Sequence, residues 1–306
     1  MNILFWQILF LALLQGVTEL FPISSLGHTV IFPGLLPPLF GKNSTNIINN
    51  PEFLPIIVAL HLGTAIALVI YFWRDWLQVL RTLGKSIKEG EVRRGTDEWV
   101  SWLIIIGCIP VGLLGVFLKD PLQHLFTSPL IASSFLVANG SVLFVGERLR
   151  RRTESKMLFL SPKEREAHFR PLSSLSWKEA IIVGLAQALA LIPGFSRSGT
   201  SIVAGLGVRL NHEDAARFSF LLGTPVIGAA ALLEVPQLFQ AQEPVSKLTF
   251  LAFIGVGMVV AGVAAFLSTK YLMKYFETGR LDPFAYYCWG AGLLAFFLFI
   301  AVLHVS

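Results

Sequence analysis

The stretch IPGFSRSGTS, residues 192–201, places an arginine and several hydroxyl groups between two apolar runs. A charge inside a membrane costs roughly 2.5–3.5 kcal/mol on insertion scales, so Arg197 is expected to have a function or a buried partner. A guanidinium binds phosphate oxygens as a fork, and Gly194 and Gly199 let backbone amides turn toward an anion. A helix expected to begin near Thr200 adds the positive end of its dipole, so the stretch predicts a phosphate or diphosphate site. Three more hydroxyl donors are available: Ser196, Ser198 and Ser201.

A second polar stretch, ELFPISSLGH, interrupts the first apolar region. Glu19 is the only acidic residue before Glu52, and Gln15 lies four residues earlier on the same helical face. Beside a phosphate site, the carboxylate of Glu19 can hold a divalent cation or accept a proton. The alternative is that Glu19 is a helix-end carboxylate that faces water. Ser25 and His28 are three residues apart, so the imidazole could act on the hydroxyl as a general base or acid; a structural histidine is equally compatible with this spacing.

The composition shows which kind of protein must position these groups. Of 306 residues, 54% are hydrophobic and 14% are charged, against about 25% charged in soluble domains. The sequence therefore predicts an all-α polytopic membrane protein. The basic residues concentrate in particular loops, so the net charge of +5 does not indicate a nucleic-acid partner. Six stretches are long enough to cross a bilayer as helices, namely 52–73, 99–118, 129–146, 218–234, 248–268 and 283–304.

Regions 3–36 and 180–208 are apolar but interrupted by the two polar stretches. Broken helices are tolerated at membrane depth only where they are buried in protein or line a wet cavity. Of the 24 basic residues, 20 fall in segments 74–98, 147–178, 209–217 and 269–282. The positive-inside rule makes these segments cytoplasmic if both interrupted regions re-enter, the first from outside and the second from inside.

The chain also repeats itself. Each half is predicted to hold a re-entrant hairpin followed by three crossings, and an odd number of crossings inverts one half relative to the other. The predicted parts are a first repeat (1–146), a basic cytoplasmic linker (147–178) and a second repeat (179–306). Inverted repeats place a site near the bilayer midplane, where SSLGH and GFSRSG are expected to face each other. The aligned identities are Gln15 with Gln187, Ser24 with Ser196, Gly27 with Gly199, and Leu62-Gly63-Thr64 with Leu222-Gly223-Thr224.

The remaining polar groups suggest packing or solvation rather than chemistry. His61 lies on a predicted spanning helix, where packing or a helix–helix hydrogen bond is expected. The arginine run 150–152 is interpreted as a topology and anionic-lipid signal. Small residues around Gly255, Gly257 and Gly262 permit close helix packing and a possible homodimer. The other histidines, expected to be solvated, are His124, His168, His212 and His304.

With these motifs in hand, the chain resembles the bacterial undecaprenyl-pyrophosphate phosphatases of the bacitracin-resistance type. That family carries an (E/Q)xxxE motif, here Gln15 to Glu19, followed by PxSSxGH, here Pro22 to His28. Its second signature, PGxSRSxxT, matches residues 193–201, with Ser201 in place of the final threonine. The resemblance covers essentially the whole chain. Its active-site positions fall on Glu19, Ser25, His28, Ser196, Arg197, Ser198 and Ser201.

The resemblance implies removal of the terminal phosphate from a C55 polyprenyl diphosphate in the bacterial cytoplasmic membrane, which recycles the carrier lipid of cell-wall synthesis. It also implies a divalent cation, Mg²⁺ or Ca²⁺, for which Glu19 and Gln15 are the expected ligands. Gln15 weakens any scheme that needs two carboxylates on a metal. Ser25, activated by His28 or Glu19, is a candidate nucleophile, and direct attack by water fits the sequence equally well.

Two other classes of protein share some of these features. A lipid-phosphate transporter or flippase would also combine inverted repeats and broken helices with a buried arginine. A histidine-nucleophile lipid phosphatase would need a second histidine and a Lys/Arg motif, which are not found in this sequence.

Overall fold

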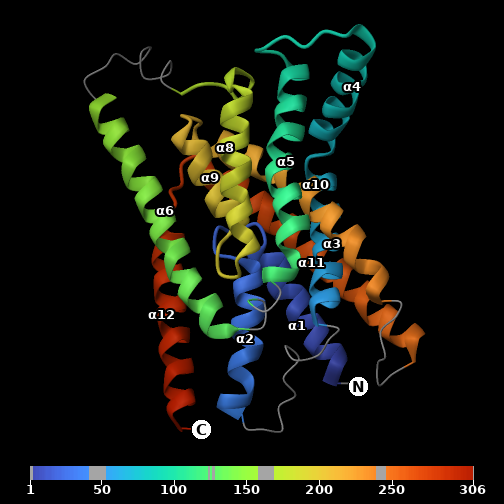
Figure 1. Ribbon diagram of the computed structural model, residues 1–306, viewed down its shortest axis with the longest axis vertical. Coiled ribbons are helices and arrows are strands. Elements are labelled where there is room, and N and C mark those ends of the chain that lie inside the picture. The colour runs from blue at the N-terminus through green and yellow to red at the C-terminus, as the bar shows by residue number, and fades with distance from the viewer. Residues whose placement is uncertain are drawn as a thin grey trace.

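The computed structural model describes residues 3–40, 53–122, 125, 128–157, 169–238 and 246–305, and within them the chain is built of helices without strands (Figure 1). The first half contains α1 (Ile3–Thr18), α2 (Ser25–Phe40), α3 (Phe53–Tyr71), α4 (Trp73–Glu89), α5 (Asp97–Leu122) and α6 (Pro129–Met157). The second half contains η3 (Leu172–Ser174), α8 (Trp177–Ala188), η4 (Leu189–Leu191), α9 (Arg197–Gly207), α10 (His212–Leu238), α11 (Lys247–Phe276) and α12 (Asp282–Val305).

Five of the described helices are long and apolar enough to cross a membrane, and they include five of the six predicted spans. These helices are α5, α6, α10, α11 and α12. The sixth predicted span, 52–73, corresponds to the apolar helix α3, which joins α4 at a bend of 80°; the bent pair counts as a sixth candidate span. The all-helical, multi-pass membrane architecture predicted from composition is therefore confirmed.

Helix α4 was not predicted as an element of its own. The basic segment 74–98 is predicted to be a loop, but residues 74–89 belong to a strongly amphipathic helix that is capped by Gly90 in the left-handed conformation (φ 67°). Periodicity, rather than mean hydropathy, carries the signal for such a helix.

Two short hairpins, α1–α2 and α8–α9, enter the bundle from opposite ends, and their tips meet near its middle (Figure 1). Helix α1 packs on α11, and α8 packs on α5. Both contacts are closest at a glycine: a Cβ at Gly16 would overlap the carbonyl oxygen of Ala261, and one at Gly184 would overlap that of Gly107. Helices α6 and α12 lie side by side, as do α3 and α10.

The hairpin tips are closed by the same local device in both halves. Ser24 precedes α2 and Ser196 precedes α9, and each hydroxyl accepts a hydrogen bond from the amide three residues on, at 3.1 Å. Such N-caps satisfy an amide that the helix itself leaves unpaired. Because Ser196 caps the helix, α9 begins at Arg197, three residues before the predicted start at Thr200.

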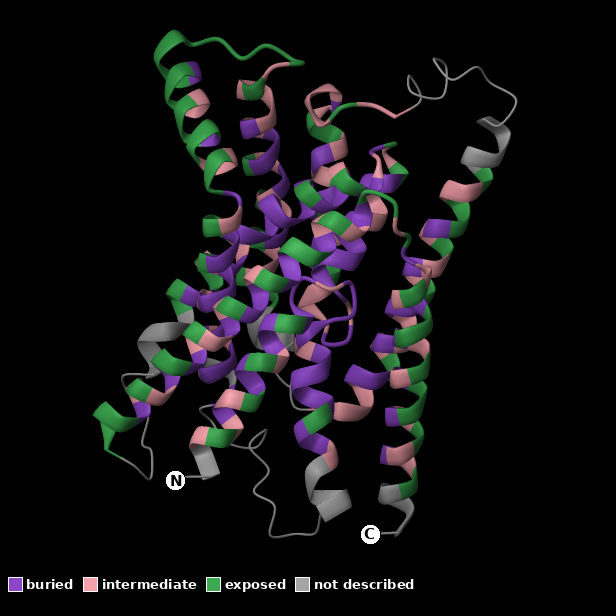
Figure 2. Cartoon of the chain, turned by 180° about the vertical axis from the view of Figure 1, so that it is seen from behind, coloured by how far each residue is buried: buried purple, intermediate pink, exposed green. Residues whose placement is uncertain are grey.

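Buried Asn139 on α6 ties the two tips together. Its side-chain amide donates to the carbonyl of Pro22 at 3.0 Å, and its carbonyl oxygen accepts from the backbone amide of Ser196 at 3.0 Å. Ser198 adds a hydrogen bond from its hydroxyl to the carbonyl of Phe21 at 3.2 Å. The surroundings of both tips are buried (Figure 2), so the polar residues that they carry sit in the protein interior.

One expectation about the basic segments is wrong. His212 was expected to be solvated but is 9% exposed, because α10 begins there and packs its ring parallel to that of Phe276. Its Nε2 lies 2.8 Å from Glu147 on α6, and Nη1 of Arg150 lies 2.5 Å from its Nδ1. Arg151 pairs with Asp282, so the arginine run also makes specific contacts.

Other expectations fall on parts of the chain that the structure leaves out. His124, His168 and the linker segment 158–168 lie outside the described residues, and so does the side chain of His304. Gly257 and Gly262 pack within the chain, where a Cβ would meet Ile8 or the carbonyl of Gly63.

Candidate active site

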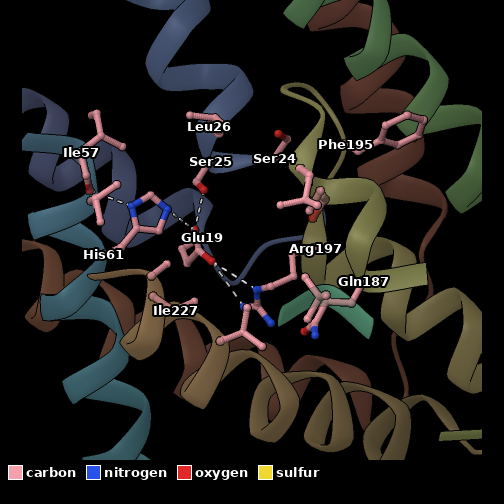
Figure 3. A pocket seen from close by; sticks show the side chains of 17 residues that line it. Glu19, Ser24, Ser25, Leu26, Ile57, His61, Gln187, Phe195, Arg197 and Ile227 are labelled. Atoms are coloured by element: carbon pink, nitrogen blue, oxygen red, sulfur yellow. Dashed lines mark hydrogen bonds and ion pairs between the residues drawn. The ribbon is translucent and has the colours of Figure 1, made fainter. Parts of the chain in front are cut away.

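A cavity of about 230 Å³ lies where the two hairpin tips meet α3, α5 and α10 (Figure 3). Most of its wall is apolar, including Leu26, Val58, Phe195 and Ile227. Seven lining residues are polar or charged: Glu19, Ser24, Ser25, His61, Gln187, Ser196 and Arg197. An apolar pocket with a few converging polar groups is the usual form of a ligand site.

Four side chains contact the carboxylate of Glu19 on the polar side of this cavity. Its Oε2 accepts a hydrogen bond from the hydroxyl of Ser25 at 2.5 Å and from the amide of Gln15 at 2.9 Å. The same oxygen lies 3.3 Å from Nε2 of His61, and Oε1 lies 3.4 Å from both Nε and Nη2 of Arg197. The hydroxyl of Ser25, the amide of Gln15 and the guanidinium of Arg197 all donate to this buried carboxylate, which compensates it for the loss of water.

Arg197 comes from the opposite hairpin, as the first residue of α9. Its side chain is 9% exposed, and Nη1 donates to the carbonyl of Ser219 on α10 at 3.1 Å. The guanidinium lies over Gly223, where a Cβ would overlap it. The sequence predicted a buried partner or a function for this arginine, and the partner in the described structure is Glu19.

Ser25 is the first residue of α2. The preceding residue, Ser24, has a positive φ of 69°, an uncommon conformation for a residue other than glycine. Ser25 and Arg197, the first residues of α2 and α9, both line the cavity, so both helices begin there. The positive dipole ends of these helices converge on the cavity together with the guanidinium of Arg197. This arrangement suits an anion with several oxygens.

The remaining predicted phosphate-binding residues do not reach the cavity. The hydroxyls of Thr200 and Ser201 donate to backbone carbonyls one turn earlier, at 3.0 and 2.7 Å, and Ser201 also bonds Ser219 at 2.6 Å. Ser198 bonds Phe21, and Gly199 is packed between Leu143 and Pro22. These four residues build and seat α9, which in turn holds Arg197.

His28 was predicted to act on Ser25, but the structure directs it elsewhere. Its Nδ1 lies 2.7 Å from the carbonyl of Ser24, and its Nε2 lies 2.8 Å from the hydroxyl of Tyr287 on α12. The imidazole is stacked on the Tyr287 ring and does not line the cavity. Within the described structure, the hydroxyl of Ser25 instead donates to Glu19.

Sequence reasoning missed two contributors. His61 was expected to pack or to hydrogen-bond between helices, and its Nε2 does lie 3.3 Å from Glu19 at the end of α1, but a place in the cavity was not expected; its Nδ1 contacts the carbonyl of Ile57 at 2.7 Å. Asn139 was not singled out, although it positions both hairpin tips. Neither residue lies in a motif: His61 reaches the cavity from α3, and Asn139 holds the hairpin tips from α6.

The divalent cation implied by the resemblance can be tested against the residues present. Among the described residues, no three His, Cys, Asp or Glu side chains are grouped to hold a metal. Glu19 supplies one carboxylate, and Oε1 of the adjacent Gln15 is buried without a hydrogen-bond partner in the described structure. Mg²⁺ often binds through one or two carboxylates plus substrate phosphates, so these two groups fit a cation that a diphosphate helps to coordinate.

Fold and cavity together define a polytopic membrane protein with a buried serine–carboxylate–arginine site. The family model described as "Bacitracin resistance protein BacA" matches residues 8–294, and the chain belongs to this family. It is 45% identical to the "Undecaprenyl-diphosphatase" of Acidiphilium cryptum over 94% of this chain and 95% of that protein. It is 44% identical to the "Undecaprenyl-diphosphatase 1" of Burkholderia pseudomallei (97% and 98%), and 43% identical to the "Undecaprenyl-diphosphatase" of Mycolicibacterium paratuberculosis (91% and 92%).

Proposed function

We propose that this protein is a membrane phosphatase that hydrolyses undecaprenyl diphosphate to the monophosphate and inorganic phosphate. Relatives covering nearly the whole chain carry the name of this activity, and these comparisons give the transporter alternative no support. The observation that carries the proposal is the 2.5 Å hydrogen bond from Ser25 to Glu19 in a cavity that also holds Arg197. A hydroxyl beside a carboxylate and a cation is suited to phosphoryl transfer.

In the proposed complex, Arg197 and the N-termini of α2 and α9 bind the diphosphate. The guanidinium can present two parallel donors to phosphate oxygens once Glu19 moves from it. The apolar wall around Leu26 and Ile227 accommodates the first part of the polyprenyl chain. Binding in a cavity with little water strengthens each of these electrostatic contacts.

Ser25 is the proposed nucleophile and Glu19 its general base. The hydroxyl proton passes to Oε2 as Oγ attacks the terminal phosphorus, and the bond from that phosphorus to the bridging oxygen breaks. The lipid monophosphate leaves, and water then hydrolyses the phosphoserine. His61, 3.3 Å from Glu19, is placed to take up the proton in turn. Direct attack by water, with Glu19 as base, remains the alternative for the first step.

Glu19 and Oε1 of Gln15 would hold a divalent cation, Mg²⁺ or Ca²⁺. When bound, the cation neutralises charge on the diphosphate. The residues of the chain itself bind the phosphates, position the hydroxyl and accept its proton.

The two hairpins are proposed to be re-entrant elements of inverted repeats, 1–146 and 179–306, joined by the cytoplasmic linker 147–178 in the inner membrane. The matched N-caps at Ser24 and Ser196 support this arrangement. The matched packing of α1 on α11 and of α8 on α5 supports it as well. Dimerisation stays a prediction.

The test is phosphate release by the purified protein in detergent with undecaprenyl diphosphate and Mg²⁺. Release that stops with a chelator and in Arg197→Ala is expected, while Arg81→Ala, at an exposed arginine of α4, retains it. A wild-type protein that binds the lipid but releases no phosphate contradicts the proposal and favours a transporter. A fully active Arg197→Ala variant contradicts the site assignment.

A further inference from the structure

Gln187 is the one polar lining residue of the described cavity whose side chain has neither a hydrogen bond within the protein nor a role in the mechanism above. It lies near the C-terminal end of α8, is 0% exposed, and sits beside Arg197 (Figure 3). Neither its Nε2 nor its Oε1 has a hydrogen-bond partner in the described structure. A buried amide with both atoms unpaired destabilises a fold, and native proteins rarely keep one without a reason.

The repeat supplies an internal comparison. Gln187 aligns with Gln15 at the register that aligns the two N-cap serines. Gln15 donates from Nε2 to the carboxylate of Glu19, four residues on, at 2.9 Å. The residue four positions after Gln187 is Leu191, which has no acceptor. The second glutamine is therefore left with a free donor at the place where the first one holds an anionic oxygen.

The charge of the cavity makes a phosphate the fitting partner. Arg197 is the only Lys or Arg in the described lining, and one guanidinium cannot serve all the oxygens of a diphosphate. A neutral amide adds a donor without adding a charge that would have to be buried when the site is empty of substrate.

We propose that Gln187 is a substrate-binding residue whose Nε2 donates to a phosphate oxygen of the diphosphate. This inference rests on the proposed function for the identity of its ligand. Because the amide is unpaired without that ligand, Gln187 stabilises the complex and destabilises the free protein.

The test compares Gln187→Met, which keeps the volume and removes both polar atoms, with Gln187→Glu, which keeps the shape and replaces the donor by a carboxylate. Leu185→Ala, at a half-exposed position of the same helix, is the matched control. Two quantities are measured on the full-length protein: KM and kcat for undecaprenyl diphosphate, and the shift in Tm produced by farnesyl methylenediphosphonate, which cannot be hydrolysed.

For Gln187→Met we expect the KM to rise about 10- to 100-fold with a smaller change in kcat, as for a lost hydrogen bond to a charged group. Its ligand-free Tm should rise above that of the wild type, and its ligand-induced shift should shrink. Gln187→Glu should bind more weakly still, because its carboxylate repels the phosphates. The control should keep the wild-type KM and ligand-induced shift.

An unchanged KM and an unchanged ligand-induced Tm shift in both variants would overturn the inference. So would a Gln187→Met variant whose ligand-free Tm and substrate affinity both fall below those of the wild type, as for a structural residue. If the wild type releases no phosphate, the proposed function fails, but the Tm shift with the diphosphonate still decides whether Gln187 binds a diphosphate.

Discussion

Substitution of Gly223 by alanine tests whether the position of Arg197 controls activity. Gly223 lies on α10 directly beneath the guanidinium, and a Cβ there would overlap Nη1. That nitrogen donates to the carbonyl of Ser219 at 3.1 Å, one turn earlier on the same helix. The added methyl must therefore displace the guanidinium from this anchor, although no charged group is removed.

The expected size of the effect follows from the contact that is displaced. A hydrogen bond to a charged group is worth about 1.5–3 kcal/mol, and 1.36 kcal/mol changes a rate tenfold. Displacing one donor of Arg197 from the phosphates should therefore lower kcat/KM about 10- to 150-fold. Arg197→Ala should lose more, about 100- to 1000-fold or beyond, as when a preorganised transition-state donor is removed.

The matched control is Gly228→Ala on the same helix, where a Cβ would meet no atom within 4 Å. Both substitutions raise helix propensity by about 1 kcal/mol, so a loss of activity cannot come from a weakened α10. Phosphate release and Tm should be measured for both variants. Equal kcat/KM values in Gly223→Ala and Gly228→Ala would refute the role assigned to the position of Arg197.

Further predictions follow from the same geometry. Ser25→Ala should abolish phosphate release and the rapid-quench phosphoserine signal expected in the wild type; near-full activity would instead support direct water attack. His61→Gln keeps a donor beside Glu19 but no titrating ring, so the pH profile of kcat/KM should change shape while the Tm changes little; an unchanged profile would exclude proton transfer through His61. Titration calorimetry should detect Mg²⁺ only together with a diphosphate analogue, because Glu19 is the single carboxylate of the described lining; tight binding to the free protein would contradict this. Burial raises the pKa of Glu179, but hydrogen bonds from Ser176 and Arg170 outweigh it and hold the pKa below 4.5, so Glu179→Gln should lower the Tm at pH 7 and have progressively less effect as the pH falls below 4.5.

The sequence was sufficient to predict the central features of the site because they are encoded locally. The repeat aligned Ser24 with Ser196, and the two residues do occupy equivalent places, each capping a helix through an amide three residues on. The cost of a buried arginine predicted a partner for Arg197, and the repeat predicted that the partner would come from the opposite hairpin. Glu19 meets both expectations.

Features that depend on packing between distant helices could not be read in this way. His61 faces Glu19 only because α3 packs against α1, and no spacing within either helix indicates that contact. His28 has the expected spacing from Ser25, but its Nε2 contacts the hydroxyl of Tyr287, which is more than 250 residues away in the sequence. The hydroxyls of Ser198, Thr200 and Ser201 bond backbone carbonyls, and composition cannot distinguish such a side chain from one that faces a cavity.

The contact between Glu19 and Arg197 has a consequence for selectivity. In the ligand-free protein, the carboxylate of Glu19 is already paired with the guanidinium of Arg197. Because it belongs to the same chain, this carboxylate competes with any incoming anion at a high effective concentration. A singly charged anion such as chloride or acetate offers Arg197 no more than Glu19 does and must also pay for its own loss of translational freedom. In the proposed complex, the diphosphate replaces the carboxylate on Arg197, and the proposed cation would give Glu19 a new positive partner in the same exchange. The resting site is thereby closed to the abundant small anions of the cell and opens to ligands of higher charge.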